Sequence, residues 1–273
     1  MLKELGPVLQ GWQIEKGVPG RDECKISFLY SDIGKKYYSN LGWHPFPSSH
    51  MEFSSSVPSK QSSSAKPLQC ADLPDLCKLD QHYLKKYLQE VKDVRPHVAL
   101  VPDNDVMVWH HKREDFMTSK LFGKSPTTKG AIVGSEGARV WAIWTRTFSG
   151  ALDDEKSGNT LHILRLVIED EQAKELNAQA LKDIIELAQA EATEYVNFLL
   201  FNCGTLTLIR WKCLHVELWN PTEQVKELVT KTGLEHKTVD RESESIASLM
   251  WYGSGGDEVE EIEWVGNEKY GWC

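Results

Sequence analysis

A serine-rich segment near residue 60 limits how this chain can fold more than any other feature. Seven of the eleven residues from Ser54 to Ser64 are serine, and such a segment has few apolar side chains to bury in a core. It predicts a linker, so the chain divides into one unit before it and one unit after it. The length of 273 residues agrees with this division, because one core commonly serves about 150 residues.

Charge and composition exclude several classes of protein. The formal net charge is -9 and the pI is about 5.5, whereas a protein that neutralises nucleic-acid phosphates needs the opposite balance. The longest uncharged apolar runs, such as 198–203, are far shorter than the ~20 residues of a membrane helix, and the first residues lack a signal-peptide core. The six cysteines form no C-x-x-C pair, which suits a reducing compartment. We expect a cytoplasmic protein that neither spans a membrane nor binds nucleic acid.

Hydrophobic periodicity predicts an α/β fold (α+β in its order of elements) with a largely antiparallel sheet. A strand at 24–30 and a helix that ends at Leu41 precede the linker, together with a short strand at 50–53. Helices are expected after the linker at 76–91, 171–197 and 222–232. Strands are expected there at 106–110, 131–133, 139–148, 160–168, 205–209, 214–219, 234–239 and 245–252, the last two as a closing hairpin.

The stretch from Leu29 to Trp43 contains the most informative residues. The predicted helix has an apolar stripe for the core, formed by Ile33, Tyr37 and Leu41. Tyr38 is rotated away from this stripe, and the residues four and seven positions before it are Gly34 and Ser31. These small residues leave space below the phenolic hydroxyl, where a ligand could lie. The alternative is that Tyr38 is a half-buried surface tyrosine.

The spacing from Ser31 through Gly34 and Tyr37-Tyr38 to Gly42-Trp43 resembles the N-x-x-A-x-x-[FL]-Y-x-x-x-G-[FW] pattern of the GNAT acetyltransferase fold. The string LYSDIGKKYYSNLGWHPFPSSH resembles the fungal lysine N6-acetyltransferase family within that superfamily. The resemblance is specific over residues 1–53, and the remaining sequence is compatible with the C-terminal domain of that family. It implies an N-acetyltransferase that uses acetyl-CoA as co-substrate and a small-molecule amine, the side chain of lysine, as acceptor.

The resemblance also implies roles for individual residues. In such enzymes acetyl-CoA lies in a cleft between two splayed strands, the amine attacks the thioester directly, and a tyrosine at the position of Tyr38 protonates the departing thiolate. Ser31 replaces the usual Asn that holds the pantetheine arm, and its hydroxyl can still donate one hydrogen bond. Gly34 and Lys35 are the other candidate cofactor contacts. Lys35 could reach a CoA phosphate, or it could form a solvated pair with Lys36.

By this resemblance the chain is a partial GNAT-like strand-helix unit followed by a second, degenerate GNAT-like domain. The predicted boundaries are 1–53 for the GNAT part, 54–67 for the linker, 68–253 for the second domain and 254–273 for an acidic tail. The tail carries five of the nine net negative charges, and its aromatic residues Trp264, Tyr270 and Trp272 suggest that its end packs on an apolar surface.

One expected part of such an enzyme is missing from the sequence. The Gly-rich, Arg-containing turn that binds the CoA pyrophosphate would lie immediately before Met1. The second domain has Glu169-Asp170-Glu171 at the corresponding turn, and three carboxylates repel a pyrophosphate. We therefore do not expect the second domain to bind CoA. The alternative function is a noncatalytic truncated fragment, or an interaction module that lacks the CoA phosphate loop.

Other signals carry less weight. His110 and His111 lie in a predicted strand and would point to opposite faces, so they are expected to be core or surface residues rather than ligands of one metal ion. Cys203 follows an apolar run, which favours a packing role over a nucleophilic one. No metal site is predicted.

Overall fold

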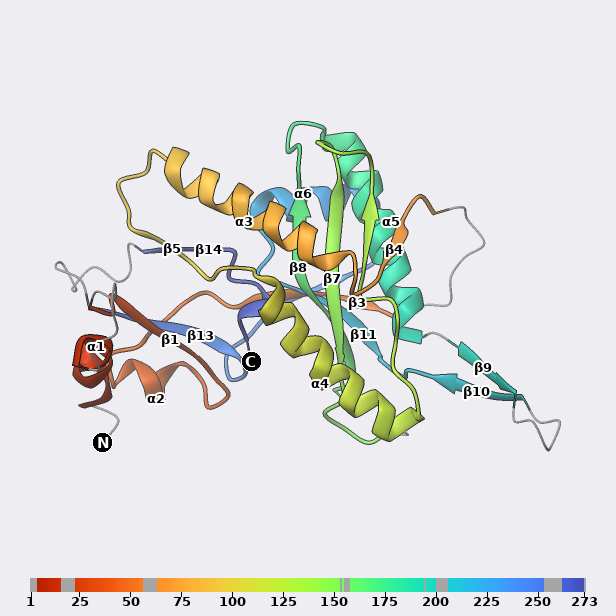
Figure 1. Cartoon of the computed structure of the whole chain (residues 1–273), viewed down its shortest axis with the longest axis horizontal. Coiled ribbons are helices and arrows are strands. Elements are labelled where there is room, and N and C mark those ends of the chain that lie inside the picture. Colours follow the sequence, from red (N-terminus) through yellow and green to blue (C-terminus); the bar gives the residue numbers. More distant parts are fainter. Residues whose placement is uncertain are drawn as a thin grey trace.

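The fold is built around one seven-stranded sheet, and the computed structural model describes residues 4–15, 23–55, 63–152, 154, 158–193, 195–199, 206–252 and 262–272 (Figure 1). The elements in chain order are α1 (Leu5–Glu15), β1 (Ile26–Ser31), α2 (Lys35–Ser39), β2 (His44–Pro45), β3 (Ser49–Ser54), β4 (Lys66–Leu68), α3 (Leu73–Glu90), β5 (His97–Ala99), α4 (Asn104–Phe122), β6 (Gly130–Val133), β7 (Val140–Thr147), β8 (Thr160–Ile168), α5 (Lys174–Thr193), β9 (Tyr195–Leu199), β10 (Leu206–Arg210), β11 (His215–Trp219), α6 (Glu223–Thr232), β12 (Lys237–Asp240), β13 (Ile246–Trp251), β14 (Glu263–Val265) and the 3-10 helix η3 (Lys269–Gly271).

The strand order of the large sheet is β12-β3-β11-β8-β7-β6-β4. Every neighbouring pair is antiparallel except β11 and β8, which are parallel. The predicted α/β fold with a mostly antiparallel sheet is therefore confirmed. The strand predicted at 50–53 lies inside this sheet, because β3 pairs with β11 on one edge and with β12 on the other. Strand β3 thus precedes the predicted linker in sequence but pairs with strands that follow it.

Helices cover both faces of the sheet. On one face α5 packs through residues spaced three and four apart, among them Leu181, Ile184 and Ala188, all fully buried. In β8, Leu161 and Ile163 point to this core, whereas Leu164 points to a second core that includes residues of α3 and α4. Figure 1 shows α3 and α4 on the near side of the sheet.

The N-terminal strands form a smaller sheet with a strand from the end of the chain. Strand β1 runs antiparallel to β13 from the Ile26–Trp251 pair to the Ser31–Ile246 pair, and β2 pairs with the other edge of β13. The predicted closing hairpin is therefore wrong, because its two strands, β12 and β13, pair with β3 and with β1 and β2 instead. Strand β14 pairs in parallel with β5, and Trp264 packs against aromatic rings of the N-terminal unit. Residues 254–261 of the predicted acidic tail lie outside the described residues.

The strand predicted at 106–110 is also wrong, because these residues belong to α4. The Asp103 side chain accepts a hydrogen bond from the Val106 N-H at 2.9 Å and caps the helix, and Gly123 ends it at a φ of 72°. Capping residues at both ends outweigh the strand propensity of the Val-Met-Val run. His110 and His111 are thus helix neighbours, not strand neighbours.

Helix α1 runs through Gly6 and Pro7. One prediction for the N-terminal unit needs correction. The helix expected to reach Leu41 is the short α2, which begins after Gly34 and contains no buried residue. Ile33 and Tyr37 are 60% and 48% exposed, so the predicted core stripe is wrong.

A buried ion-pair network joins α4 to the sheet and to the end of α5. Glu114 is 1% exposed and accepts hydrogen bonds from Lys129 Nζ at 2.6 Å and from Arg146 Nη1 at 2.9 Å. Its Oε1 also accepts from the Arg146 backbone N-H at 2.9 Å. The second side of the Arg146 guanidinium reaches Glu191 Oε2 at 2.6 Å. Each of these buried charges has an opposite charge beside it.

We expect Glu114→Ala to lower the free energy of unfolding by about 3–5 kcal/mol, because it leaves two buried cations without their shared carboxylate. Urea denaturation of the variant and of the unchanged chain measures this loss. The matched control is Glu223→Ala, which removes an exposed partner of Lys226 and should cost less than about 1 kcal/mol. Equal losses in the two variants would contradict a central role for Glu114.

Candidate functional site

Tyr38, the predicted acid, is half-buried near the end of α2. Its ring packs edge-to-face against Tyr37 and Trp43, with ring centroids 5.1 and 6.3 Å away. Trp43 is 3% exposed and donates its indole N-H to Ser27 Oγ at 3.1 Å, so it forms a fixed wall. Within the described part of the chain the Tyr38 hydroxyl has no hydrogen-bond partner. The phenolic hydroxyl is therefore neither sealed in the interior nor hydrogen-bonded to another described side chain.

Ser31 closes the turn between β1 and α2. It is 1% exposed, and its hydroxyl donates to the Gly34 carbonyl at 3.0 Å while accepting from the Ile33 N-H at 3.2 Å. A hydroxyl has one proton, so Ser31 could donate to a pantetheine arm only by giving up its bond to Gly34. Its cofactor role stays a prediction.

Gly34 and Lys35 lie beside the loop before β13. Gly34 has a φ of 79°, and its N-H donates to the Ser243 carbonyl at 2.9 Å. A residue with a Cβ is strained in this conformation, which explains the glycine. Lys35 Nζ lies 2.7 Å from Glu242 Oε1 in a solvent-exposed ion pair, which another anion could replace at little cost. The chain thus brings Ser31, Gly34, Lys35 and Tyr38 together within one strand-turn-helix segment.

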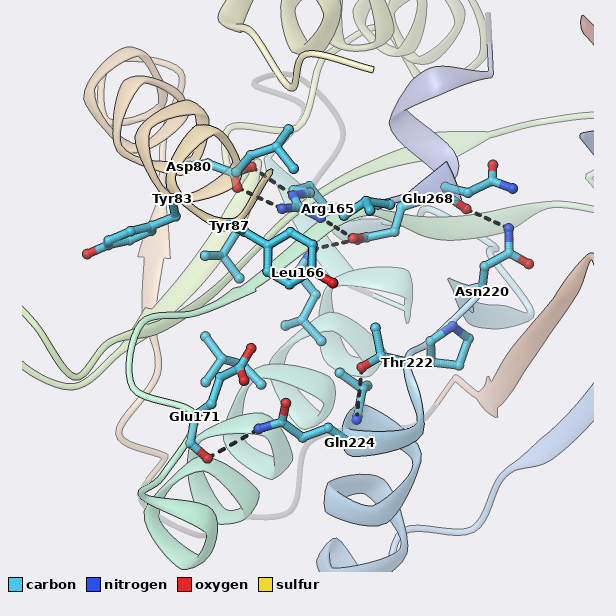
Figure 2. Close-up of a pocket in the computed structure, with 18 of the residues that line it drawn as sticks. Asp80, Tyr83, Tyr87, Arg165, Leu166, Glu171, Asn220, Thr222, Gln224 and Glu268 are labelled. Carbon is cyan, nitrogen blue, oxygen red and sulfur yellow. Dashed lines mark hydrogen bonds and ion pairs between the residues drawn. The ribbon is translucent and has the colours of Figure 1, made fainter. Parts of the chain in front are cut away.

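None of these four residues lines a cavity of about 1030 Å³ in the described part of the chain. This cavity lies between α3, the last residues of β8, the turn before α5, the segment after β11 and the stretch 263–268. Figure 2 shows part of its wall, with Tyr83 and Tyr87 of α3 on one side and the segment that contains Asn220 and Thr222 on the other. The predicted site and this cavity are therefore separate places.

A buried ion triad forms one side of the cavity (Figure 2). Arg165 binds both oxygens of Asp80 through its Nε and Nη2 atoms, each at 2.7 Å, and its Nη1 contacts Glu268 Oε1. Burial raises the pKa of the Glu268 carboxyl above its ordinary value, and the Arg165 guanidinium opposes this effect. The triad ties α3 and the C-terminal segment to β8.

Glu268 also lies beside the part of β8 that extends beyond its pairing with β11. The parallel pairing of β8 with β11 ends at the Ile163–Leu218 pair, although β8 continues to Ile168. The backbone N-H of Leu166 donates to Glu268 Oε2 at 2.9 Å (Figure 2). A side chain of this protein therefore satisfies a backbone donor that the gap between the parallel strands leaves free.

The charge of the cavity does not fit the phosphates of CoA. Its lining contains six acidic and two basic side chains, which are Asp80, Glu90, Glu169, Glu171, Glu263 and Glu268 against Lys86 and Arg165. Glu169, at the turn before α5, already binds Arg139 through the backbone N-H at 2.8 Å and the guanidinium. Carboxylates at this position repel a pyrophosphate. The lining of the cavity therefore does not suit the pyrophosphate of CoA.

Three other residues were considered in the sequence, namely His110, His111 and Cys203. The two histidines are buried in the core. His110 Nε2 pairs with the Tyr270 carbonyl at 2.9 Å, and burial lowers the pKa of His110 to about 4. His111 Nε2 pairs with the Trp144 carbonyl at 3.0 Å, so both rings are core residues. Cys203 lies outside the described residues. None of the helices in the described ranges combines the length and the apolar character that crossing a bilayer requires.

Sequence reasoning missed Arg165 and Glu268. A signal for Arg165 was present, because it is the one arginine in the otherwise apolar run Ile163–Ile168 of a buried strand. Its partners are 85 residues before it and 103 residues after it, and no local pattern connects them.

Most of the chain is similar to a known protein family. The family described as "LYC1 GNAT-like C-terminal domain" matches residues 50–273. No curated protein matches the sequence. Among solved structures, a GCN5-related N-acetyltransferase from Anabaena variabilis ATCC 29413 is similar, with 15% identity and a TM-score of 0.45. The similarity covers 91% of this chain and 49% of that one, so this chain spans about half the length of that protein.

We expect Glu268→Ala to lower the free energy of unfolding by about 2–4 kcal/mol, because Leu166 loses its acceptor and Arg165 one of its counter-charges. Glu268→Gln should cost about half as much, since the amide oxygen can still accept from Leu166. Thermal and urea unfolding give both values. Glu90→Ala, at an exposed position on the same cavity, is the control. A Glu268→Ala variant as stable as this control would refute the closing role of Glu268.

Proposed function

Because the chain belongs to the family of LYC1 GNAT-like C-terminal domains, we propose that it acts in an acetyl-CoA-dependent N-acetyltransferase. The family match over residues 50–273 is the observation that carries this proposal. The acceptor is the side-chain amine of lysine, which attacks the acetyl thioester directly. The resemblance of residues 29–50 to fungal lysine N6-acetyltransferases supports this choice of acceptor.

Tyr38 is the residue that stabilises the departing thiolate. A phenol with a pKa of ~10 facing a thiol of ~8.5 is mismatched by about 1.5 units, or about 2 kcal/mol, so complete proton transfer is uphill. A hydrogen bond to the developing negative charge is favourable without complete transfer. The half-buried hydroxyl of Tyr38, free of other partners in the described part of the chain, supports this role.

Ser31, Gly34 and Lys35 supply the contacts to the co-substrate beside Tyr38. Gly34 contributes room rather than a donor, because its N-H is already bonded to Ser243. Lys35 contributes a positive charge whose exchange from Glu242 leaves no buried group unpaired. The amine must lose a proton before it attacks, since the ordinary pKa of a lysine side chain is ~10.4.

The second domain supports the first and forms a wall of the acceptor cleft. Its cavity is lined mainly by acidic side chains, which repel the phosphates of CoA. The Leu166 N-H of β8 is already bonded to the Glu268 carboxylate. We keep the boundaries 1–53, 54–67, 68–253 and 254–273 as functional divisions. Residues 68–253 do not form an independent folding unit, because β3, which precedes them, supplies an inner strand of their sheet.

The proposal is tested with a thiol-release assay that contains acetyl-CoA and lysine. We expect lysine-dependent release by a longer chain in which an Arg/Gly-rich phosphate-binding turn precedes Met1, and far slower release by residues 1–273, because backbone N-H groups of that turn hold the pyrophosphate. Replacing lysine with an amine-free carboxylic acid is the control. A longer chain that binds acetyl-CoA but transfers nothing to lysine or to other primary amines would favour the noncatalytic interaction module.

Tyr38→Phe in the same longer chain should lower turnover by about 100-fold or more, because it removes the donor to the thiolate. The affinity for acetyl-CoA should change little, since the aromatic ring remains. Steady-state kinetics and equilibrium binding of acetyl-CoA measure the two quantities. The neighbouring Tyr37→Phe, which removes an exposed hydroxyl, serves as the matched control. Unchanged turnover in Tyr38→Phe would remove this residue from the mechanism.

A further inference from the structure

A cluster of histidines and glutamates lies on the face of the large sheet opposite α5. The strand register places Glu217 of β11 beside Glu52 of β3 and beside His162 of β8. His50 and His215 are two residues from these glutamates along β3 and β11, so their side chains point to the same face. We call these five residues the His-Glu cluster. It shares no residue with the cavity or with the Tyr38 segment.

The distances within the cluster suit a shared ion. His162 Nδ1 lies 3.3 Å from Glu217 Oε2, His215 Nδ1 lies 3.4 Å from Glu52 Oε1, and His50 Nε2 lies 3.8 Å from Glu217 Oε1. One ligand atom from each of His50, Glu52 and Glu217 lies within 4.8 Å of the others. Zinc binds nitrogen and oxygen at about 2.0–2.2 Å, so two ligands of one tetrahedral ion are roughly 3.3–3.5 Å apart. Small side-chain movements bring the cluster to that spacing.

Several buried ring nitrogens in the cluster make no hydrogen bond of good geometry, although those of His162 and His215 lie beside a carboxylate oxygen. Among the described residues this holds for Nδ1 of His50, of His162 and of His215. His162 is the clearest case, since it is only 8% exposed and its Nδ1 faces Glu217. Buried polar atoms in folded proteins nearly always have a partner, which can be an ion. These ring nitrogens and the two carboxylates are the donor types that zinc and its neighbours in the first transition series bind.

Nearby cations limit how strongly the cluster attracts an ion. Arg241 and Lys269 stack on the Trp219 ring, 3.7 and 4.1 Å from its centroid, and the Trp219 indole N-H donates to Glu217 Oε2 at 3.0 Å. Lys237 Nζ lies 3.3 Å from Glu52 Oε1, but its side chain is 74% exposed and can swing into solvent. These charges offset part of the attraction, so we expect micromolar affinity.

The second group of potential ligands in the described residues provides a contrast. Asp93, His97 and Glu263 also lie within 4.8 Å of one another. However, the Arg95 guanidinium bridges this group, with Nη2 2.5 Å from Asp93 and 2.9 Å from Glu263. A cation of the protein already bridges two carboxylates of that group, whereas among the described residues the Lys237 ammonium contacts only Glu52 of the His-Glu cluster.

We propose that His50, Glu52 and Glu217 bind one divalent transition-metal ion of the zinc class, with the His162 and His215 rings at its edge. The ion joins β3, which precedes the predicted linker, to β11, which follows it. Its role is to fasten the N-terminal unit to the sheet of the second domain.

The test is isothermal titration of the whole chain, freed of metal by a chelator, with zinc chloride. We expect one ion per chain with a dissociation constant on the order of micromolar, and a higher melting temperature with zinc, because the ion binds only the folded state. Cobalt(II) should give the visible absorption of a four-coordinate nitrogen and oxygen site.

Variants locate the ion. His50→Ala combined with Glu217→Gln should weaken zinc binding by about 100-fold or more, and Glu52→Gln, at the rim of the cluster, provides a milder change if the double variant fails to fold. His97→Ala, in the cluster bridged by Arg95, is the matched control and should leave binding unchanged. Absence of stoichiometric uptake, or uptake that Glu52→Gln and the double variant leave unchanged, would overturn the proposal.

Discussion

The position of β3 between β11 and β12 is the constraint on which the rest of the structure depends. Its backbone pairs on both sides, and its buried residues Met51 and Phe53 enter the core beneath α5. An inner strand cannot be removed without exposing both of its neighbours to water. The strand-turn-helix segment that contains Tyr38 lies shortly before β3, so its place relative to the second domain follows from this pairing.

The Glu268 side chain closes the gap between β8 and β11. In an open gap the Leu166 N-H would be free for a ligand, but here Glu268 accepts it and Arg165 holds the carboxylate in place. Asp80 holds the other side of Arg165, which connects the gap to α3. An acidic side chain of the protein itself, Glu268, therefore accepts the backbone donor that this gap leaves open. This arrangement agrees with the supporting role that we propose for the domain.

Much of the fold was predictable because its signals are local. The strands at 140–147 and 160–168 and the helix at 223–232 have clear periodicity or caps, such as Thr222 before the helix and Gly233 after it. The failures depend on long-range pairing. Strand β13 resembles the second arm of a hairpin with β12, but the partner that it needs, β1, lies about 220 residues earlier. In α4, the local cap at Asp103 outweighs the β-branched run that predicts a strand.

The two candidate sites differ in the same way, because one is built from a local segment and the other from long-range strand pairing. Ser31, Gly34, Lys35 and Tyr38 lie within eight residues, so one turn and one short helix bring them together and a sequence pattern can reveal them. The His-Glu cluster needs the register of three strands, in which a shift of one residue would turn its side chains into the core. Because alternate positions of these strands are the apolar core, the core itself maintains that register. The packing that stabilises the sheet thus also assembles the cluster, although no segment of the sequence contains it.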